Sequence, residues 1–448
     1  MVDKPHILIV GGGYVGMYSA LRLQRRLSRR EATITVVDPQ NHMTYQPFLP
    51  EAAAGSVEPR HVVVPLRRVL DRCTVLTGTV VKIEHARRVA VVRPLEGADL
   101  EVSYDHIVVA PGSVARTLPI PGLAEIGIGF KTIGEAIYLR NHVLARLDFA
   151  ASTPDAERRK RALTFVFVGG GYAGIEAFAE LEDMARYATR YYDQLSPRDM
   201  RWVLVEAAGR ILPEVSVQMA DYTVRQLLGR GMDIRLNTRL RSCVGGHIVL
   251  DDDEEFDAET VVWTAGVKPN PMVVNTDFAL DDKGRLPCTA ELRVRGVEGA
   301  WSAGDCAAVP DLTKIKTDPT ALTGPSAQHA VRQAKVLANN IVATIRGRKL
   351  TPYKHAYAGS VASLGLHKGV ADVYGVKLRG MTAWLMHRTY HLSRMPTLNR
   401  KSRIVADWTL ALFFRREVVS LGQLQQPRRE FELAALPSDA DRPLSTGT

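Results

Sequence analysis

Two sets of glycines carry the first chemistry that this sequence offers. Gly11, Gly13 and Gly16 follow a short apolar run, and Asp38 ends the next apolar run. In a strand–turn–helix unit the first glycine permits a tight turn, the second lets the backbone approach a pyrophosphate, and the third lets helix and strand pack closely. The helix N-terminus supplies free N–H groups for the phosphates, and the acid can bind ribose hydroxyls. The pattern predicts a dinucleotide site.

The same unit occurs a second time, from about residue 163 to Glu206. Its core reads GGGYAG, with Gly169, Gly171 and Gly174, where the first unit reads GGGYVG, so the two form an internal repeat. Glu206 is expected to accept a hydrogen bond from the ribose 2′-OH and to repel a 2′-phosphate, which favours NADH over NADPH. Two dinucleotide sites imply one dinucleotide that is held and one that exchanges, which is the layout of a flavoprotein reductase.

Later segments are expected to complete the first site. An apolar run ends in Ala110-Pro111-Gly112 and places backbone against the dinucleotide again. Another strand is expected to run into Gly304-Asp305, where the carboxylate lies beside a helix start and can bind a ribityl or pyrophosphate-linked hydroxyl. Together with the first glycine motif this is a flavin signal.

A long helix is predicted from about Pro325 to Ile345. Gln328 and the residues one turn later, Arg332 among them, share one face of it. Their side chains face a flavin edge or a polar ligand head in one interpretation. In the other they belong to a capped surface helix.

Composition limits the class of protein. With 448 residues, 46% apolar and 24% charged, the chain is expected to form two or three globular domains. The net charge of +10 indicates an anionic partner or surface without identifying it. Four scattered cysteines without a CxxC motif argue against metal clusters and disulfide scaffolds. We expect no signal peptide and no transmembrane helix, which predicts a protein of the cytoplasm or of the inner face of a membrane.

The segment from Lys377 to Arg416 differs from the rest. Basic residues alternate there with the apolar-aromatic patches Ala383–Met386 and Trp408–Phe414, and Pro396 separates two helical stretches. Such helices suit a membrane interface; the alternative is that they pack on the body or form a dimer contact. No nucleic-acid motif is visible. Residues from about 427 onward are expected to be disordered.

Two further segments have a structural and a functional interpretation. Residues 184–201, rich in Tyr and Arg, are interpreted as an extended solvated helix, with a partner or membrane surface as the alternative. The acidic run Asp251–Glu255 is interpreted as a hairpin turn, because it lacks the alternating ligands and glycine bend of a hard-ion loop.

The motifs together resemble the type II, non-proton-pumping NADH:quinone oxidoreductases within the two-dinucleotide-binding-domain flavoproteins. The resemblance covers about residues 5–416. It rests on GGGYVG with Asp38, NHMTYQPFLPE, GGGYAGIE, VEAAGRILP, WTAGVKPNP, SAGDCAA, AQHAVRQ and the basic C-terminal helices. The family implies FAD in the first site, NADH in the second, and a quinone near the flavin ring on the membrane-facing side.

The resemblance also implies an architecture. It predicts an α/β fold with two Rossmann-like dinucleotide-binding domains and a C-terminal amphipathic helical region that associates with membrane. The expected FAD-binding domain is discontinuous, and we expect a homodimer on the cytoplasmic face of the membrane. The expected limits are residues 1–115 with 270–350 for FAD, 116–269 for NADH, 351–416 for the C-terminal region and 417–448 for a partly disordered tail.

By the same likeness the site residues fall into three groups. The residues expected at FAD are Gly11, Gly13, Gly16, Asp38, Pro47, Ala110, Gly112, Gly304, Asp305 and Ala327. The residues expected at NADH are Gly169, Gly171, Gly174, Glu206, Ala265 and Gly266. The residues expected at the reacting centre are Glu176, Gln328 and Arg332.

Glu176 is expected near the nicotinamide–flavin stack and Gln328 near the quinone end. Glu176 either tunes proton or charge balance at the stack or is a first-turn acid that complements the helix dipole. The sequence departs from the family at Arg332, where a second Gln is usual, and at Asp38, where many relatives carry Glu.

The cysteines argue against two related activities, and two other functions stay open as alternatives. Disulfide reductases need a CxxxxC beside the flavin, and no cysteine precedes Cys73. Sulfide:quinone oxidoreductases need cysteines at the ring, whereas Cys306 is interpreted as ordinary packing. A soluble reductase of a protein acceptor stays open, and so does an NADH-binding interaction or sensor flavoprotein resembling apoptosis-inducing factor.

Overall fold

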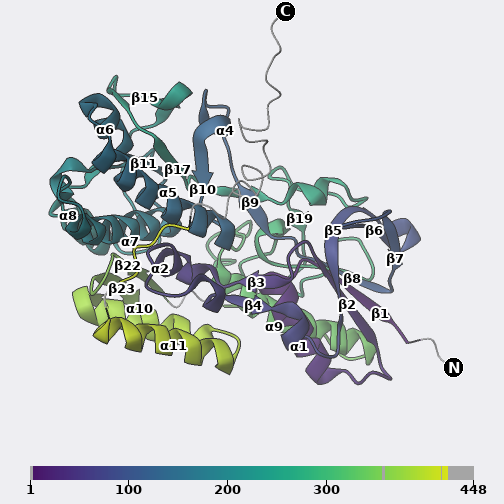
Figure 1. Cartoon of the computed structure of the whole chain (residues 1–448). Coiled ribbons are helices and arrows are strands. Elements are labelled where there is room, and N and C mark those ends of the chain that lie inside the picture. The colour runs from purple at the N-terminus through teal and green to yellow at the C-terminus, as the bar shows by residue number, and fades with distance from the viewer. Residues whose placement is uncertain (1–3, 356–358, 415, 422–448) are drawn as a thin grey trace, which may run out of the picture.

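The computed structural model describes residues 4–355, 359–414 and 416–421. The chain forms two α/β units, each built on a mainly parallel sheet, and a smaller C-terminal part that packs beneath both of them (Figure 1). The predicted disorder beyond residue 427 lies outside the described residues.

The first unit contains a seven-stranded sheet. In spatial order its strands are β20 (Ala300–Ser302), β8 (His106–Val109), β1 (His6–Val10), β2 (Thr33–Asp38), β5 (Thr74–Glu84), β6 (Val89–Pro94) and β7 (Leu100–Ser103). The strands from β20 to β5 pair in parallel, and β5, β6 and β7 form an antiparallel meander. Strand β20 joins this sheet from far along the chain, which is the discontinuity expected of the FAD-binding domain.

Two helices from distant parts of the sequence cover this unit. Helix α1 (Tyr14–Arg26) connects β1 to β2, and α9 (Ala327–Ile345) packs against α1. The Ser19 hydroxyl on α1 donates to the Ala334 carbonyl on α9 at 3.3 Å, and both residues are fully buried. The predicted long helix is confirmed, with its N-cap at Ser326.

The second unit is built on five parallel strands. In order they are β10 (Gly127–Gly129), β17 (Thr260–Trp263), β11 (Thr164–Val168), β12 (Arg201–Glu206) and β13 (Asp233–Leu236). Every residue of β11 is buried, as expected for a central parallel strand covered on both faces. Helices α5 (Ile133–Ser152), α7 (Tyr172–Ala188) and α8 (Val217–Leu228) contribute to its core.

The two units are joined by a paired crossing. Strand β9 (Ser113–Ala115) leaves the first unit and β18 (Val267–Pro269) returns to it, and the two pair antiparallel. The exact domain limits stay a prediction, but this pairing lies close to both expected crossings.

Shorter elements complete the chain. The remaining helices and strands are β3 (His42–Thr44), η1 (Gln46–Phe48), α2 (Leu49–Ala53), η2 (Pro59–His61), β4 (Val63–Pro65), α3 (Leu66–Val69), η3 (His85–Arg87), α4 (Leu123–Ile126), α6 (Ala156–Ala162), η4 (Thr189–Tyr191), η5 (Pro197–Asp199), β14 (Leu240–Ser242), η6 (Val244–Gly246), β15 (His247–Leu250), β16 (Glu255–Asp257), η7 (Pro271–Val274), β19 (Leu286–Pro287), η8 (Gly304–Cys306) and β21 (Ala307–Ala308).

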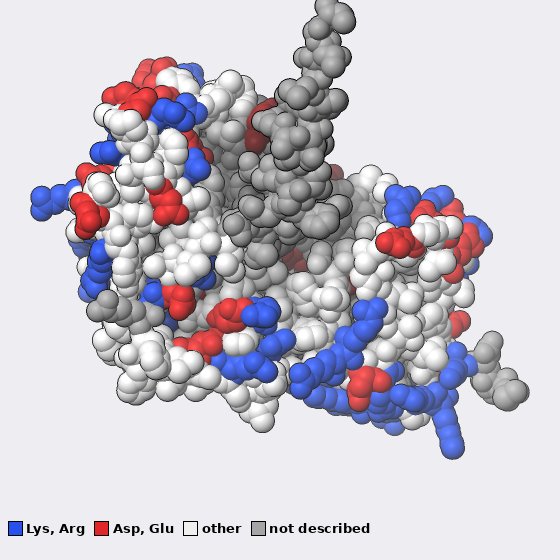
Figure 2. Space-filling model, in the orientation of Figure 1, with Lys and Arg blue, Asp and Glu red and all other residues white. Residues whose placement is uncertain are grey.

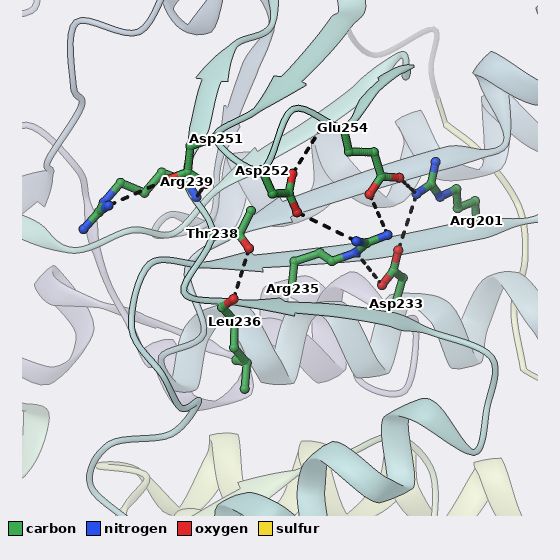
Figure 3. Close-up of polar contacts among 9 residues, drawn as sticks. All are labelled: Arg201, Asp233, Arg235, Leu236, Thr238, Arg239, Asp251, Asp252 and Glu254. Atoms are coloured by element: carbon green, nitrogen blue, oxygen red, sulfur yellow. Dashed lines mark hydrogen bonds and ion pairs between the residues drawn. The ribbon is translucent and has the colours of Figure 1, made fainter.

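The acidic run forms the predicted hairpin turn, between β15 and β16. Glu254 in this turn contacts Arg201 and Arg235, each at 2.6 Å, and Asp233 lies in the same network (Figure 3). Side chains of the run therefore neutralise arginines of β12 and β13. Within the described ranges no group of three His, Cys, Asp or Glu side chains is arranged to hold a metal ion.

The prediction of an extended helix over residues 184–201 is wrong. Helix α7 ends at Ala188, and the 3-10 turns η4 and η5 follow. The Ser196 hydroxyl accepts a hydrogen bond from the Arg198 N–H, and Pro197 begins η5. At the end of α7 the Thr189 hydroxyl donates to the Arg186 carbonyl at 2.8 Å, and further along, the serine hydrogen bond and the fixed φ of proline favour the second turn.

The C-terminal part is more than a pair of helices. It starts with the antiparallel sheet β22 (Gly359–Ser363), β23 (Gly369–Val373) and β24 (Val376–Arg379), which the sequence analysis did not separate. Helix α10 (Gly380–Arg394) packs on this sheet, and α11 (Leu398–Phe413) follows after the predicted break at Pro396. Among the described residues no helix is long and apolar enough to span a bilayer.

Candidate functional site

The first glycine turn combines two positions that exclude a side chain with one that leaves space. Gly11 has φ +98°, and a Cβ there would lie 2.3 Å from the Ala110 carbonyl oxygen. A Cβ on Gly16 would lie 1.7 Å from the Gly11 carbonyl oxygen. Gly13, the N-cap of α1, has no atom within 4 Å of an added Cβ. The turn is therefore held closed on its inner side and open where α1 presents its free N–H groups.

The second turn repeats this arrangement. Gly169 has φ +114° and contacts the backbone of Thr264 so closely that a Cβ would lie 2.7 Å from it. A Cβ on Gly174 would lie 2.0 Å from the Gly169 carbonyl oxygen, whereas Gly171, the N-cap of α7, faces open space. Each turn thus leaves one open glycine at a helix N-terminus.

Each predicted ribose acid is held by its own glycine turn. Asp38 Oδ2 accepts from the Gly12 N–H at 2.6 Å, and Oδ1 accepts from Gln40 at 2.7 Å. Burial raises the pKa of the Asp38 carboxyl, and these two N–H donors oppose that rise. Glu206 likewise accepts from the N–H groups of Gly170 and Ala208. In each unit the acid is fixed at the carboxyl end of a central strand.

Each unit has a second glycine that faces open space, at the end of another strand. Gly112 follows Ala110 with φ +74°, and Gly266 follows Ala265 with φ +91°. An added Cβ would meet nothing within 4 Å at either position. Both units therefore leave unfilled space at one helix N-terminus and at one further strand end, which fits a dinucleotide in each.

Asp305 belongs to a half-buried polar group at the first site. Its Oδ2 accepts from the Ser113 hydroxyl at 2.6 Å, and that hydroxyl oxygen accepts from Lys131 Nζ at 2.6 Å. Burial lowers the pKa of the Lys131 ammonium, and the Asp305 charge opposes this. Asp305, which was predicted at the FAD site, therefore has a hydroxyl partner and a nearby cation within the protein.

Gln333 is a residue of the first site that the sequence analysis did not assign. Its side chain is buried, with Oε1 accepting from the Gly304 N–H at 2.8 Å and Nε2 donating to Thr323 at 3.1 Å. It ties α9 to the GDC turn. Ala327 begins the same helix, and Pro47 lies in η1 next to Gln46, whose N–H donates to the Tyr14 hydroxyl at 3.1 Å.

Gln328 and Arg332 form a pair on α9. Arg332 Nη1 donates to the Gln328 backbone oxygen at 3.1 Å and to its side-chain oxygen at 3.3 Å. Gln328 Nε2 donates to the Gly359 carbonyl at 2.9 Å. The arginine that replaces the usual second glutamine therefore occupies the amide oxygen of the first.

Glu176 contacts the last residue of strand β22, whose first residue, Gly359, binds Gln328. Its Oε1 accepts from the Ser363 N–H at 2.8 Å and lies 3.0 Å from His387 Nε2 on α10. Strand β22 begins at Gly359 and ends at Ser363. The structure thus brings Glu176 and Gln328 to the two ends of one short strand.

Glu176 is one member of a buried acid cluster that also contains Glu51, Glu180 and His387. All four side chains are nearly inaccessible, with relative exposures of 1% for Glu51, 7% for Glu176, 2% for Glu180 and 1% for His387. The Ser363 hydroxyl donates to Glu180 Oε1 at 2.6 Å, and His387 Nδ1 lies 3.9 Å from Glu51 Oε1. The cluster connects α2 of the first unit, α7 of the second and the C-terminal part.

Arg388 binds the Glu51 side of this cluster. Its Nη2 lies 3.1 Å from Glu51 Oε2, which also accepts from Trp408 Nε1 at 2.9 Å. The guanidinium lies 3.9 Å from the ring centroid of Trp384 and 4.7 Å from that of Trp408. Helices α10 and α11 are therefore anchored to the first unit by a buried ion pair between two aromatic rings.

The cluster changes the proton affinity of its members. Burial, followed by the charge of Glu51, raises the pKa of Glu180 to about 7. Burial acts to lower the pKa of His387, but the contact with Glu176 and the charges of all three acids raise it overall. Burial, with the charge of His387, lowers the pKa of His391 well below its usual value.

The sequence contained signals for some of these residues. Glu51 ends the NHMTYQPFLPE loop, and Glu180 lies one helical turn after Glu176, so both acids share a face of α7. His387 and Arg388 lay within the basic segment, but nothing in their spacing indicated which acids they would meet. Their partners come from two other parts of the chain.

The cysteines provide no redox pair in the described residues. All four are free, and Cys306 is buried within the GDC turn. Burial raises the pKa of the Cys306 thiol to about 11, opposite to the shift of a reactive thiolate. This agrees with the interpretation of Cys306 as ordinary packing.

The chain has two α/β units, each with a glycine turn, a carboxylate held by that turn and open backbone at a strand end. This is the arrangement of a reductase of the two-dinucleotide class. A family model described as pyridine nucleotide-disulphide oxidoreductase matches residues 5–334, and the chain belongs to that family.

The two similar proteins described next are named as an NADH dehydrogenase and an NADH:quinone oxidoreductase. The chain is 27% identical over 94% of its length and 92% of the relative to a probable NADH dehydrogenase of Dictyostelium discoideum. It is 28% identical over 86% of its length and 94% of the relative to a type II NADH:quinone oxidoreductase of Staphylococcus haemolyticus.

Solved structures match the fold. NDH2 of Plasmodium falciparum in complex with NADH superposes with a TM-score of 0.85 at 18% identity, covering 93% of this chain and all of that one. The sulfide:quinone oxidoreductase of Aquifex aeolicus reaches 0.68 at 14% identity, covering 93% and 96%. The fold is therefore shared by enzymes of different substrates.

The open glycines give a first prediction. Gly13→Ala should fold normally but lose FAD, because the added methyl occupies the space where the pyrophosphate approaches. Gly171→Ala should retain FAD and lose kcat/KM for NADH by about 10²-fold, since a misplacement of about 1 Å has this effect. Flavin absorbance and steady-state kinetics measure both, with circular dichroism for the fold.

Gly16→Ala is the control for this prediction, because its methyl would clash inside the turn and should destabilise the fold itself. FAD retained at full occupancy in Gly13→Ala would contradict the assignment of the first site.

The buried acid cluster gives a second prediction. The pKa of Glu180 rises from its ordinary value of 4.5 to about 7, so the folded protein holds a proton in this window that the unfolded chain has lost. Stability should therefore fall as pH rises from 4.5 to 7, by about 3 kcal/mol for this group. Glu180→Gln should remove that part of the pH dependence, measured by thermal unfolding across the window.

The exposed Glu96→Gln is the matched control and should leave the pH dependence unchanged. Parallel stability profiles for the wild type and Glu180→Gln would show that Glu180 titrates normally.

Proposed function

We propose that the chain is an FAD-dependent type II NADH dehydrogenase that transfers electrons from NADH through FAD to a membrane quinone without proton pumping. The observation that carries the proposal is the duplicated site, with one open glycine at a helix N-terminus and one fixed acid in each unit. The names of the relatives support NADH and a quinone as the two substrates.

The first unit would hold FAD. Gly13 and Gly112 leave room for the pyrophosphate, Asp38 would bind the adenosine ribose, and Asp305 would bind a ribityl or pyrophosphate-linked hydroxyl. When bound, FAD supplies the chemistry of hydride acceptance from NADH and electron delivery to the quinone. The protein positions the reactants and needs no nucleophile.

The second unit would hold NADH. Gly171 and Gly266 leave room for its pyrophosphate, and Glu206 would accept from the ribose 2′-OH. Glu206 would repel a 2′-phosphate at the same place, so the site selects NADH.

The quinone would meet the chain at β22. Gln328 at one end of the strand and Glu176 at the other are the polar side chains proposed for the reacting centre. Arg332 holds the Gln328 amide oxygen, so the amide is oriented with its NH₂ toward Gly359. Proton supply to the reduced acceptor falls to the buried acid cluster, which contains Glu176 itself and in which burial raises the pKa of Glu180 to about 7.

The proposal also covers where the protein lies in the cell and its oligomeric state. We propose a peripheral protein on the cytoplasmic face of the cell membrane, a homodimer, attached through α10 and α11 to the inner leaflet. The support is the set of exposed apolar side chains on these helices, including Leu385, Leu398 and Leu412. The proposal includes no nucleic-acid partner.

The test is NADH oxidation by purified, FAD-loaded protein with and without a short-chain quinone. NADH should bleach the flavin, and the quinone should restore it through many turnovers. Bleaching without reoxidation by quinone would assign the acceptor to a protein or the role to sensing. Failure of NADH to bleach the flavin would overturn the assignment of the second site.

Glu206 gives a prediction of cofactor selectivity. Glu206→Gln keeps an acceptor for the Gly170 N–H but removes the negative charge opposite a 2′-phosphate. The preference for NADH over NADPH should fall on the order of 10²-fold, because juxtaposed like charges cost several kcal/mol. Ratios of kcat/KM measure this. Comparable efficiencies with both cofactors in the wild type would contradict the role of Glu206.

A further inference from the structure

Near the start of α11, two arginines lie close enough to a third to act on its charge, and none of the three has an acidic partner among the described residues. Arg400 and Arg403 lie on α11, and Arg68 lies on α3. None of the three guanidiniums has a hydrogen bond or ion pair within the described parts of the chain. We call these residues the arginine trio.

Contacts elsewhere on α11 fix this arrangement. His61 Nδ1 lies 2.6 Å from Asp407 Oδ2, and the Glu58 N–H donates to the same oxygen at 3.1 Å. This holds α11 beside the segment that leads through β4 into α3. Ile404, fully buried, belongs to the same core cluster as Leu66 on α3.

The positive charges of the trio act on one another. Burial, then Arg403 and then Arg68, lowers the pKa of the Arg400 guanidinium. Like charges held together without a carboxylate are unfavourable, and an anion placed among them would relieve the repulsion. Arg403 and Arg68 are both exposed, so such an anion can approach from solvent.

An apolar surface adjoins the trio on α11. Leu398 is 79% exposed, Leu412 74% and Phe413 78%, and Leu398, Val405 and Leu412 recur every seven residues on one face. Arg403 lies seven residues before Leu410, which is also exposed, so the basic and apolar surfaces share a border. An interfacial helix needs this combination of apolar contact and basic border.

More cations continue the basic surface. The exposed arginines at the end of α1 and in the loop after it are Arg25, Arg26, Arg29 and Arg30. The Tyr18 hydroxyl on α1 donates to the Arg394 carbonyl at the end of α10 at 3.0 Å, so α1 abuts the C-terminal helices. Figure 2 shows Lys and Arg gathered over the α1 region, next to a mostly uncharged surface over α10 and α11.

We infer that the arginine trio is a binding site for the phosphate headgroup of an anionic phospholipid, at the edge of the apolar face of α11. The lipid phosphate would bridge Arg68 with Arg400 and Arg403, while the acyl chains would lie against the exposed leucines and Phe413. This inference rests on the proposed membrane attachment and specifies its partner. It predicts selective binding to bilayers that contain anionic lipid.

The test compares vesicles of phosphatidylcholine with vesicles that also contain phosphatidylglycerol, using the full-length, FAD-loaded protein in a sedimentation assay. The wild type should bind the anionic vesicles much more tightly. A triple variant, Arg68→Gln, Arg400→Gln and Arg403→Gln, should lose affinity for them on the order of 100-fold, since each basic residue at an anionic surface contributes about 1 kcal/mol.

A second triple variant controls for net charge. Arg158→Gln, Arg190→Gln and Arg198→Gln remove three exposed charges from the second unit and should leave vesicle binding nearly unchanged. An equal loss in both variants would overturn the site and leave only a general charge effect.

Other occupants give distinct results. Inorganic phosphate that stabilises the wild type and displaces it from anionic vesicles at low concentration would assign the trio to soluble phosphate. A change of oligomeric state in the trio variant, by analytical ultracentrifugation, would assign the face to a protein contact. Either result overturns the lipid site.

Turnover with a short-chain quinone in free solution separates this inference from the proposed function. The trio variant should retain the wild-type rate there, because the trio touches neither dinucleotide site. A wild type that binds anionic vesicles but reduces no quinone would retain the lipid site and remove the assigned activity.

Discussion

The arrangement of the three parts depends on carboxylates that are buried together with the side chains that neutralise them. Glu51, Glu176 and Glu180 come from helices of two different units, and His387 and Arg388 come from a third part of the chain. A carboxylate removed from water is strongly unfavourable unless a cation or donor meets it. Helix α10 supplies those partners, so the position of the C-terminal part is coupled to the loop and helix that flank the two dinucleotide sites.

The same contacts explain why Glu176 is not simply a helix-dipole acid. Its carboxylate is bound by a strand N–H and a histidine from outside its own helix. Strand β22 then carries the connection to Gln328, whose amide is oriented by Arg332. A substitution in the C-terminal part can therefore act on the proposed reacting centre through a single short strand, without touching either glycine turn.

Much of the fold could be read from local signals. The glycine spacings, the apolar runs and the acids after them predicted both dinucleotide units, because a tight turn against a neighbouring backbone leaves no space for a side chain at Gly11, Gly16, Gly169 or Gly174. The break at Pro396 and the hairpin at the acidic run followed from equally local chemistry. The prediction of an extended helix over residues 184–201 was wrong because α7 ends at Ala188 in the turn η4, and Ser196 and Pro197 then favour a second turn.

The sequence by itself determined the two α/β units with their glycine turns, the order of their elements and the acid that ends the second strand of each unit, because each depends on residues within one supersecondary unit. Only the tertiary structure decided the β22–β24 sheet, the contact of Gln333 with the GDC turn, the acid cluster and the arginine trio. The cluster and the trio join side chains that are distant in the chain. Burial and charge at such places are set by what packs on them, and no local spacing records that.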